Sequence, residues 1–282
     1  MIVVTAASGQ LGRLVVQELL KSVPASQIIA GVRSPEKAKD LASTGVQVRE
    51  LDYTKPETIQ AALAGVKKLL LISSNAVGSR AAEHKNVIDA AKKVGVELIA
   101  YTSILHADTT PMILAQEHKE TEAMIKASGL PYVFLRNGWY TENYTANIAP
   151  VLQHGAVLGS AKDGKFSLAA RADYAAAAAK VLTLDNQAGK IYELAGDVAY
   201  TLADYAAEIA KQTGKTIVYS DMPESDYAKV LVSVGLPAGF ASVLADCDTA
   251  ASKGALFDDS KTLSKLIGRA TTPIAKSIKA VL

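Results

Sequence analysis

The feature that most constrains the fold is an alternation, through the first half of the chain, of short apolar runs with amphipathic stretches. The runs are rich in β-branched residues, which favour strands, and the stretches between them repeat their apolar residues at helical spacing. The order of these segments predicts an α/β protein with a doubly wound parallel sheet. The expected strands are residues 2–5, 27–32, 46–48, 68–72, 97–102 and 131–135, and the expected helices lie near 11–20, from 35 onward, and near 55–64, 80–94 and 112–127.

This regularity fades after about residue 150. Short apolar runs at 156–158, 191–194 and 216–219 alternate there with helical stretches at 172–184, at 201–212 and beyond 223. The chain has no linker rich in Pro, Gly or Ser. We therefore expect a first domain over residues 1–150 and a smaller C-terminal α/β lobe over residues 151–282, interleaved with the first.

Composition excludes several classes of protein. Of the 282 residues, 49% are hydrophobic, so the chain can bury a large core; the 30 Lys and Arg nearly balance the 28 Asp and Glu, which argues against a nucleic-acid partner. The lone Cys247 is typical of a reducing compartment. The apolar start at 1–7 lacks the basic flank of a signal peptide, and the apolar runs at 67–73 and 172–184 are too short for a membrane span. We expect a cytoplasmic protein.

The turn after the first expected strand has the pattern of a phosphate-binding loop. It reads Thr-Ala-Ala-Ser-Gly-Gln-Leu-Gly over residues 5–12 and joins a strand to a helix, where backbone N–H groups and the helix dipole can hold a pyrophosphate. Gly9 would let phosphates approach the backbone, and Gly12 would let the helix pack close to the strand. Ala6 stands where the usual pattern has its first glycine, which is tolerable if its φ is negative. A tight turn without a ligand is the alternative.

The end of the second expected strand indicates which dinucleotide is bound. An NAD site carries Asp or Glu there for the ribose hydroxyls, whereas this chain has Arg33, with Lys37 one helical turn further. A guanidinium suits a 2′-phosphate, so the sequence favours NADP over NAD. The alternative is a solvated basic start of a helix. Asp52 could face the adenine, and residues 73–75 end the fourth strand where a ribose would pass.

The catalytic pair of ordinary short-chain dehydrogenases is missing. None of the 11 tyrosines has a lysine four residues later. In the helix where that pair would lie, His118 and Glu122 are one turn apart and could form a hydrogen-bonded pair supporting a nicotinamide pocket, or simply be the polar face of a packed helix. A ketone or alcohol substrate needs a tuned proton donor, whereas a quinone can take its proton from water, so the sequence argues against alcohol dehydrogenation.

Other chemistries have less support. The chain has no Gly-x-Ser-x-Gly elbow of a hydrolase, and Gly-Lys-Thr at 214–216 lacks the first glycine of a nucleotide-binding P-loop. The four histidines have no metal-ligand spacing, so no metal is expected. The segment 136–144, Arg-Asn-Gly-Trp-Tyr-Thr-Glu-Asn-Tyr, follows the sixth strand and could stack a planar acceptor; alternatively, its tryptophan could simply join the second lobe to the first.

At these residues the sequence resembles the NmrA-like branch of atypical short-chain dehydrogenases. Within that branch it is similar to bacterial NADPH:quinone oxidoreductases of the second type and, more distantly, to triphenylmethane reductases. The resemblance extends from end to end of the chain. It is carried by the stretches Gly9–Gly12, 23–28, 69–74, 100–103, 135–140, 171–174 and 257–263, of which Leu-Arg-Asn-Gly-Trp-Tyr and Phe-Asp-Asp-Ser-Lys-Thr-Leu are the most specific.

The resemblance implies a Rossmann-like NADP domain with a small C-terminal lobe and direct hydride transfer to a quinone, without flavin or metal. The expected cofactor-binding residues are Ala6, Ala7, Ser8, Gly9, Gln10, Leu11, Arg33, Lys37, Asp52, Ser73, Ser74, Asn75, Asn137, Gly138, Trp139, Tyr140, Thr141, Glu142 and Arg171. Tyr140, Asn143 and Tyr144 are expected to shape the acceptor slot, and His118 or Tyr140 to support catalysis. The family usually has Gly-Ala-Thr-Gly where this chain has Ala6–Gly9, a departure that bears on cofactor affinity and not on the fold.

Two other functions remain compatible with the sequence. One is a non-catalytic sensor that binds NADP(H) and reports its redox state to a protein partner. The other is a reductase of another planar acceptor, such as a triphenylmethane dye. A homodimer is also compatible with the sequence.

Overall fold

The computed structural model describes all 282 residues, which form two compact units. Each unit is assembled from separate stretches of the chain. Residues 138–150 belong to unit 2, and residues 171–192 return to unit 1. Unit 1 comprises Met1–Ile104, Glu117–Asn137 and Arg171–Tyr192, and unit 2 comprises Leu105–Gln116, Gly138–Ala170 and Glu193–Leu282.

Unit 1 is built on a seven-stranded sheet of order β3-β2-β1-β4-β5-β6-β8. The pairings from β3 across to β6 are all parallel. All five residues of β2 and all seven of β5 are buried, as expected for strands covered on both faces. The strands are β1 (Ile2–Val4), β2 (Ile28–Val32), β3 (Gln47–Glu50), β4 (Lys68–Leu71), β5 (Leu98–Ile104), β6 (Tyr132–Asn137) and β8 (Lys190–Leu194).

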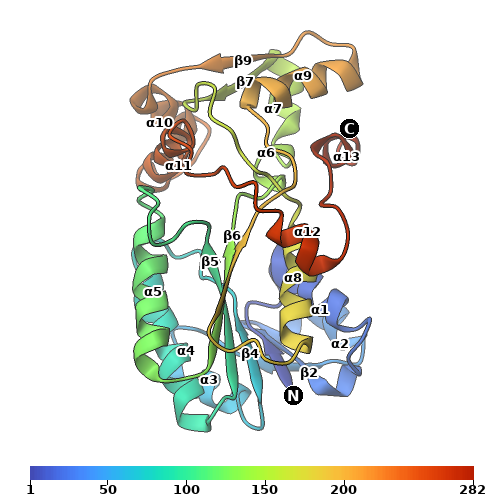
Figure 1. Ribbon diagram of the computed structural model, residues 1–282, viewed down its shortest axis with the longest axis vertical. Coiled ribbons are helices and arrows are strands. Elements are labelled where there is room, and N and C mark those ends of the chain that lie inside the picture. Colours follow the sequence, from blue (N-terminus) through green and yellow to red (C-terminus); the bar gives the residue numbers. More distant parts are fainter. The chain divides into compact units, whose positions relative to one another are not determined.

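Helices cover both faces of this sheet. In Figure 1, α3, α4 and α5 lie on one side of the strands, and α1 and α8, which pack against each other, lie on the other. A core of buried apolar residues, including Ile59, Val87 and Phe134, joins the first set to the sheet. The helices are α1 (Gln10–Leu19), α2 (Lys39–Ala42), α3 (Pro56–Ala62), α4 (Arg80–Val94), α5 (Ala115–Ser128) and α8 (Arg171–Thr183), with 3-10 turns at Ala25–Gln27 and Pro35–Lys37.

Unit 2 contains one small parallel pair of strands and most of the remaining helices. The strands are β7 (Ala156–Gly159) and β9 (Val218–Asp221). Among its helices, α10 packs against α11. The helices are α6 (Glu142–Thr145), α7 (Ile148–His154), α9 (Leu202–Thr213), α10 (Glu224–Ser233), α11 (Ala238–Ala251), α12 (Thr262–Ile267) and α13 (Ile274–Lys279).

The predicted α/β class and parallel sheet are confirmed. The predicted helix from residue 35 is instead a 3-10 turn followed by the four-residue α2, because Pro35 starts the segment but few apolar residues follow it to bury a longer helix. The run at 191–194 is β8, which joins the main sheet rather than a separate lobe sheet. None of the helices is both long and apolar enough to cross a membrane.

Candidate cofactor and acceptor site

The turn between β1 and α1 has the geometry of a phosphate-binding loop. Gly9 is the N-cap of α1; no side chain caps this helix, and its first turn carries no acidic residue. A Cβ at Gly12 would lie 2.4 Å from the carbonyl oxygen of Ala6, so only glycine allows the helix to approach the turn this closely. The first backbone N–H groups of α1 therefore face outward without a capping side chain, which is the arrangement that binds anions at helix N-termini.

Ala6 has a backbone conformation that the sequence did not predict. Its φ is +47°, in the left-handed region, where a Cβ crowds the backbone. The negative φ under which the sequence tolerates alanine at this position is not observed. The turn is nevertheless formed, because the N–H of Gly9 donates to the carbonyl of Ala6 at 2.9 Å and the N–H of Ala7 donates to Gly31 at 3.0 Å.

Arg33 follows the last residue of β2 and is exposed. Its guanidinium makes no hydrogen bond and no ion pair, whereas the neighbouring Arg13 is paired with Asp40 and donates to the carbonyl of Ser8 at 3.0 Å. Lys37, at the end of the 3-10 turn, is also exposed. Two cations without partners therefore follow the second strand, where a dinucleotide fold places its adenosine ribose.

Asp52 is held by its own turn. Its Oδ1 accepts hydrogen bonds from the backbone N–H of Thr54 at 2.9 Å and from the Thr54 hydroxyl at 2.8 Å. Partial burial opposes its ionisation, but these hydrogen bonds, with the charges of Lys55 and Arg33, outweigh burial and lower the pKa of Asp52. The carboxylate is thus ionised and oriented by Thr54.

The loop after β4 carries Ser73, Ser74 and Asn75. The N–H of Ser73 donates to Thr102 Oγ1 at 2.8 Å, and the N–H of Ser74 donates to Nε2 of His84 at 2.9 Å. The Ser74 hydroxyl donates to Glu83, while Asn75 is exposed. The backbone of this loop is therefore fixed from within unit 1, and Asn75 is left toward solvent.

A buried polar network of α4, α5 and β5 lies behind this loop. The guanidinium of Arg80 donates to the carbonyl of Ser74 at 2.6 Å and lies 3.2 Å from Nε2 of His118. Because a guanidinium can only donate, Nε2 of His118 accepts, and its Nδ1–H donates to the hydroxyl of Tyr101 at 2.8 Å. His84 has the same tautomer, since its Nε2 accepts from Ser74 and its Nδ1 lies 2.9 Å from Thr121 Oγ1.

Both histidines of this network are neutral. Burial, with the nearby charge of Arg80, lowers the pKa of His84 to about 3 and lowers the pKa of His118 well below its usual value. Of the two alternatives that the sequence left open, the hydrogen bond between His118 and Glu122 is not formed. Instead, Glu122 accepts from Ser103 at 2.6 Å and pairs with Arg136 through two hydrogen bonds, of 2.9 and 2.8 Å. His118 therefore stabilises packing behind the loop, and the residue is only 5% exposed.

The aromatic segment after β6 belongs to unit 2 from Gly138 onward, while Asn137 is the buried last residue of the strand. Tyr140 forms an isolated parallel bridge with Ala169, and the N–H of Thr141 donates to Ala169 at 3.0 Å. Trp139 and Tyr140 are half-buried. The pairing with Ala169 fixes the backbone of the segment that is predicted to contact the acceptor.

The remaining predicted residues of unit 2 differ in exposure. Asn143 is exposed, and Glu142 begins α6. The ring of Tyr144 packs edge-on against Phe166, 5.8 Å between centroids, and lies 5.7 Å from Tyr205. Burial raises the pKa of Tyr144, with a further contribution from Asp248. Tyr144 is thus anchored in the interior of unit 2. Arg171, in unit 1, is the first residue of α8.

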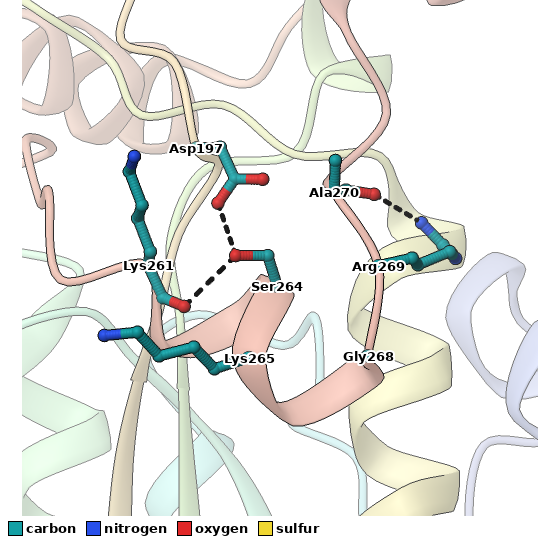
Figure 2. A pocket seen from close by; sticks show the side chains of 7 residues that line it. All are labelled: Asp197, Lys261, Ser264, Lys265, Gly268, Arg269 and Ala270. Carbon is teal, nitrogen blue, oxygen red and sulfur yellow. Dashed lines mark hydrogen bonds between the residues drawn. The ribbon is translucent and has the colours of Figure 1, made fainter.

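Two features of unit 2 were missed from the sequence. His106 and Asp258 are 152 residues apart in the chain, yet their side chains lie 3.5 Å from each other. A second feature is an open hollow of about 510 Å³ beside α12 (Figure 2). The pair of His106 and Asp258 could not be recognised from the sequence because the two residues are far apart in the chain.

The hollow in Figure 2 is lined in part by basic side chains, and none of the predicted site residues lines it. In it the hydroxyl of Ser264 donates to Asp197 at 2.6 Å and to the carbonyl of Lys261 at 3.2 Å. Its lining is Asp197, Lys261, Ser264, Lys265, Gly268, Arg269 and Ala270. No group of three or more His, Cys, Asp or Glu side chains is arranged to hold a metal ion.

The turn, the close approach at Gly12 and the two unpaired cations after β2 fit a dinucleotide carrying an extra phosphate. Comparison with known proteins agrees with this geometry. The family model described as NAD(P)H-binding matches residues 6–185. The chain is 58% identical to quinone oxidoreductase 2 of Escherichia coli over 278 residues, which cover 99% of this chain and 97% of that protein.

Solved structures show the same relationship. The NADPH complex of the NADPH-dependent quinone oxidoreductase QOR2 from Escherichia coli has a TM-score of 0.97 at 57% identity, covering 100% of this chain and 99% of the other. Triphenylmethane reductase of Citrobacter sp., complexed with NADP(H), has a TM-score of 0.95 at 40% identity over all of both chains.

A further relative supports the predicted NmrA-like resemblance. An NmrA-like family domain-containing oxidoreductase of Aspergillus flavus is 30% identical over 76% of this chain and 72% of its own. The resemblance inferred from the sequence is confirmed. The chain belongs to the NAD(P)H-binding family and, within it, to the NmrA-like group that includes quinone oxidoreductase 2.

Proposed function

We propose that the protein is a cytoplasmic NADPH:quinone oxidoreductase that reduces its acceptor directly, without flavin or metal. The observation that carries the proposal is the uncapped N-terminus of α1 followed by the unpaired Arg33, in a chain that matches an NADPH complex of a quinone oxidoreductase over its whole length. NADPH, when bound, would supply a hydride to the quinone. That the acceptor of this chain is a quinone is our inference.

The residues of unit 1 would bind and orient the cofactor. We assign the pyrophosphate to the turn of residues 6–11, through those of its N–H groups that make no hydrogen bond within the protein, and the 2′-phosphate to Arg33, with Lys37 adding charge. The loop 73–75 would follow the ribose, since His84 and Arg80 fix its backbone. Asp52, Asn137 and Arg171 complete the proposed set in this unit.

The residues of unit 2 would hold the acceptor. The half-buried Trp139 and Tyr140 offer aromatic faces for a planar ring, and Asn143 offers an exposed amide. Gly138, Thr141 and Glu142 keep this segment in place. Tyr144 acts from behind it, because its ring is packed against Phe166. Holding two flat rings in contact supplies most of the rate in such a reaction, since the chain needs little covalent chemistry of its own.

The first experiment follows NADPH oxidation by absorbance with the purified, flavin-free protein, with and without a simple benzoquinone. We expect enzyme-dependent oxidation, and NADPH preferred over NADH. Tight NADPH binding without turnover by any quinone or dye would contradict the proposal and indicate a redox sensor. Turnover of a triphenylmethane dye but of no quinone would keep the mechanism and change the acceptor. A homodimer is compatible with the proposal and is tested by sedimentation velocity.

A further inference from the structure

His106 lies two residues after the end of β5 in a backbone conformation unusual for its type. Its φ is +54°, in the left-handed region. Its N–H donates to the carboxylate of Glu193 at 2.8 Å, and its carbonyl accepts from the N–H groups of Thr109 and Thr110 at 2.9 and 2.8 Å. Non-glycine residues held in this way occur preferentially at functional sites. The backbone of unit 2 therefore fixes where this imidazole points.

Asp258 is held equally firmly opposite the ring. The hydroxyl of Ser167 donates to the carbonyl of Asp258 at 2.8 Å and accepts from its N–H at 3.0 Å. The carboxylate Oδ1 accepts from the N–H and the hydroxyl of Ser260, at 3.0 and 2.6 Å. This leaves Oδ2 to face Nε2 of His106 at 3.5 Å.

The two nitrogens of the His106 ring are therefore in different surroundings. Nε2 faces the carboxylate, which favours the tautomer that carries a proton on this nitrogen. Nδ1 makes no hydrogen bond, and the side chain is 30% exposed while that of Asp258 is 13% exposed. A histidine oriented by a carboxylate through one nitrogen can exchange a proton through the other. The charged groups that face His106 are Asp258 on its ring and Glu193 on its backbone.

The same backbone framework holds the proposed acceptor segment. Glu193 binds the N–H of His106, and the next residue, Leu194, accepts from the N–H of Gly138 at 2.7 Å. The last two residues of β8 thus bind both His106 and Gly138, where the acceptor segment begins.

A second link runs through residues 167–169. Ser167 binds Asp258, and two residues later Ala169 pairs with Tyr140. Two residues of chain span at most roughly 7 Å, so these two attachments lie close together. The His106–Asp258 pair and Tyr140 are accordingly attached to the same short segment of unit 2.

Building on the proposed function, we propose that His106, oriented by Asp258, is the proton donor for the reduced quinone. The quinone gains a hydride, that is two electrons and one proton, which leaves one oxygen as the hydroquinone anion. The charged His106 gives the proton on Nδ1 to that oxygen, which yields neutral hydroquinone and neutral imidazole. Water reprotonates the exposed ring. NADPH and one proton are consumed, and NADP+ and hydroquinone are released.

The first test compares His106→Asn with the wild-type enzyme. Asparagine tolerates the left-handed conformation better than most residues, so the turn should survive the change. We expect kcat/KM for benzoquinone to fall about 100-fold and its pH dependence to flatten, with the Kd for NADPH unchanged. Asp258→Asn should cause a smaller loss. The control is His154→Asn, because His154 is an exposed residue at the end of α7.

The second test needs neither cofactor nor turnover. 4-Nitrophenol, whose neutral and anionic forms differ in absorbance, serves as a probe of the acceptor site of the ligand-free protein. A charged imidazole beside the bound phenol should lower the pKa of the phenol by about one unit relative to His106→Asn, since opposite charges at contact distance favour ionisation.

The outcomes separate this proposal from the proposed function. A wild-type enzyme that oxidises NADPH with quinone, and an H106N variant with the same kcat/KM, pH profile and nitrophenol titration, would overturn the role of His106 and leave the quinone reductase intact. A wild-type protein without quinone turnover would overturn the proposed function, and the nitrophenol titration would then decide whether His106 lies at a site for phenolic oxygens.

Discussion

Two polar regions of unit 1 differ in a way that separates binding from structure. At the N-terminus of α1 and the end of β2, polar groups are exposed: α1 has no capping side chain, and Arg33 makes no hydrogen bond or ion pair. Behind the loop after β4, in contrast, the side chains of Arg80, His84 and His118 are buried. Arg80 donates a hydrogen bond to His118, and the two histidines are hydrogen-bonded to Tyr101 and to the backbone of Ser74. The sequence predicted site residues in both regions.

The difference shows why residue type alone does not identify a site. A buried group without a hydrogen-bond partner costs free energy, so an interior network saturates itself and has no capacity left for a ligand. A surface loop can keep its donors free because water satisfies them until a ligand arrives. Exposed and unpaired cations are therefore the better sign of a phosphate site, and buried, paired histidines are the better sign of a scaffold.

The largest expected effect comes from the buried network. Glu122→Ala removes the carboxylate that accepts two hydrogen bonds from Arg136 and one from Ser103. Breaking such a buried pair costs about 3–5 kcal/mol of the free energy of unfolding, measured by chemical denaturation. The control is Glu97→Ala, which breaks an exposed pair with Lys67 and should cost less than about 1 kcal/mol. Equal losses for the two variants would contradict the distinction between the regions.

Arg33→Ala tests the exposed region. The lost guanidinium contact to a 2′-phosphate should raise the Kd for NADPH by about 10- to 100-fold, which corresponds to roughly 1.5–3 kcal/mol for a charged hydrogen bond. The Kd for NADH and the free energy of unfolding should change little, because Arg33 is exposed and makes no hydrogen bond or ion pair within the protein. Lys39→Ala, a nearby exposed cation in α2, is the charge-matched control. A parallel loss for NADPH and NADH would remove Arg33 from the phosphate site.

The buried histidines also predict how stability depends on pH. The pKa of His84 is about 3 in the folded protein and about 6.5 when unfolded, so the folded state binds fewer protons. Stability is therefore full above pH 6.5 and falls as the pH decreases toward 3; by pH 5 the loss from His84 is about 2 kcal/mol. His118 acts in the same direction. Denaturation curves at pH 7 and 5 measure the effect, and His84→Asn should reduce it. Curves that do not shift would show that His84 is protonated in the folded state.

The sequence predicted the elements whose pattern is local. The expected helices at 80–94 and 172–184 correspond to α4 (Arg80–Val94) and α8 (Arg171–Thr183) within one residue at each end. The alanine-rich run of α8 has a high helix propensity, and the left-handed Gly95 marks the end of α4. Such features depend only on neighbouring residues and are therefore present in the sequence itself.

The parts of the site that depend on distant partners were not predictable in the same way. The sequence offered a hydrogen bond between His118 and Glu122 as one alternative, because they are one helical turn apart. In the structure His118 contacts Arg80 and Tyr101 instead, and Glu122 pairs with Arg136. Spacing along a helix gives proximity, and it does not say which of several partners wins. Likewise, nothing local distinguishes His106 from the other histidines until Asp258 is placed beside it.

The smallest effect concerns Ala6, where the exposed region carries a cost of its own. A left-handed backbone costs a non-glycine residue about 1–2 kcal/mol, and glycine loses about 0.5–1 kcal/mol of that gain through its freer unfolded chain. Ala6→Gly should therefore raise the midpoint of denaturant unfolding by the equivalent of up to about 1 kcal/mol. A variant with no gain in stability would show that the turn relaxes around Ala6.

The Kd for NADPH then separates two causes of this cost. If the strain lies only in the backbone, it is present with and without the cofactor, so its relief stabilises the fold and leaves the Kd unchanged. If the Cβ of Ala6 also crowds the phosphates, Ala6→Gly tightens NADPH binding as well. The first result would make this chain's departure from the glycine pattern a matter of stability alone. The second would make Ala6 a determinant of cofactor affinity and would place the phosphates directly against the turn.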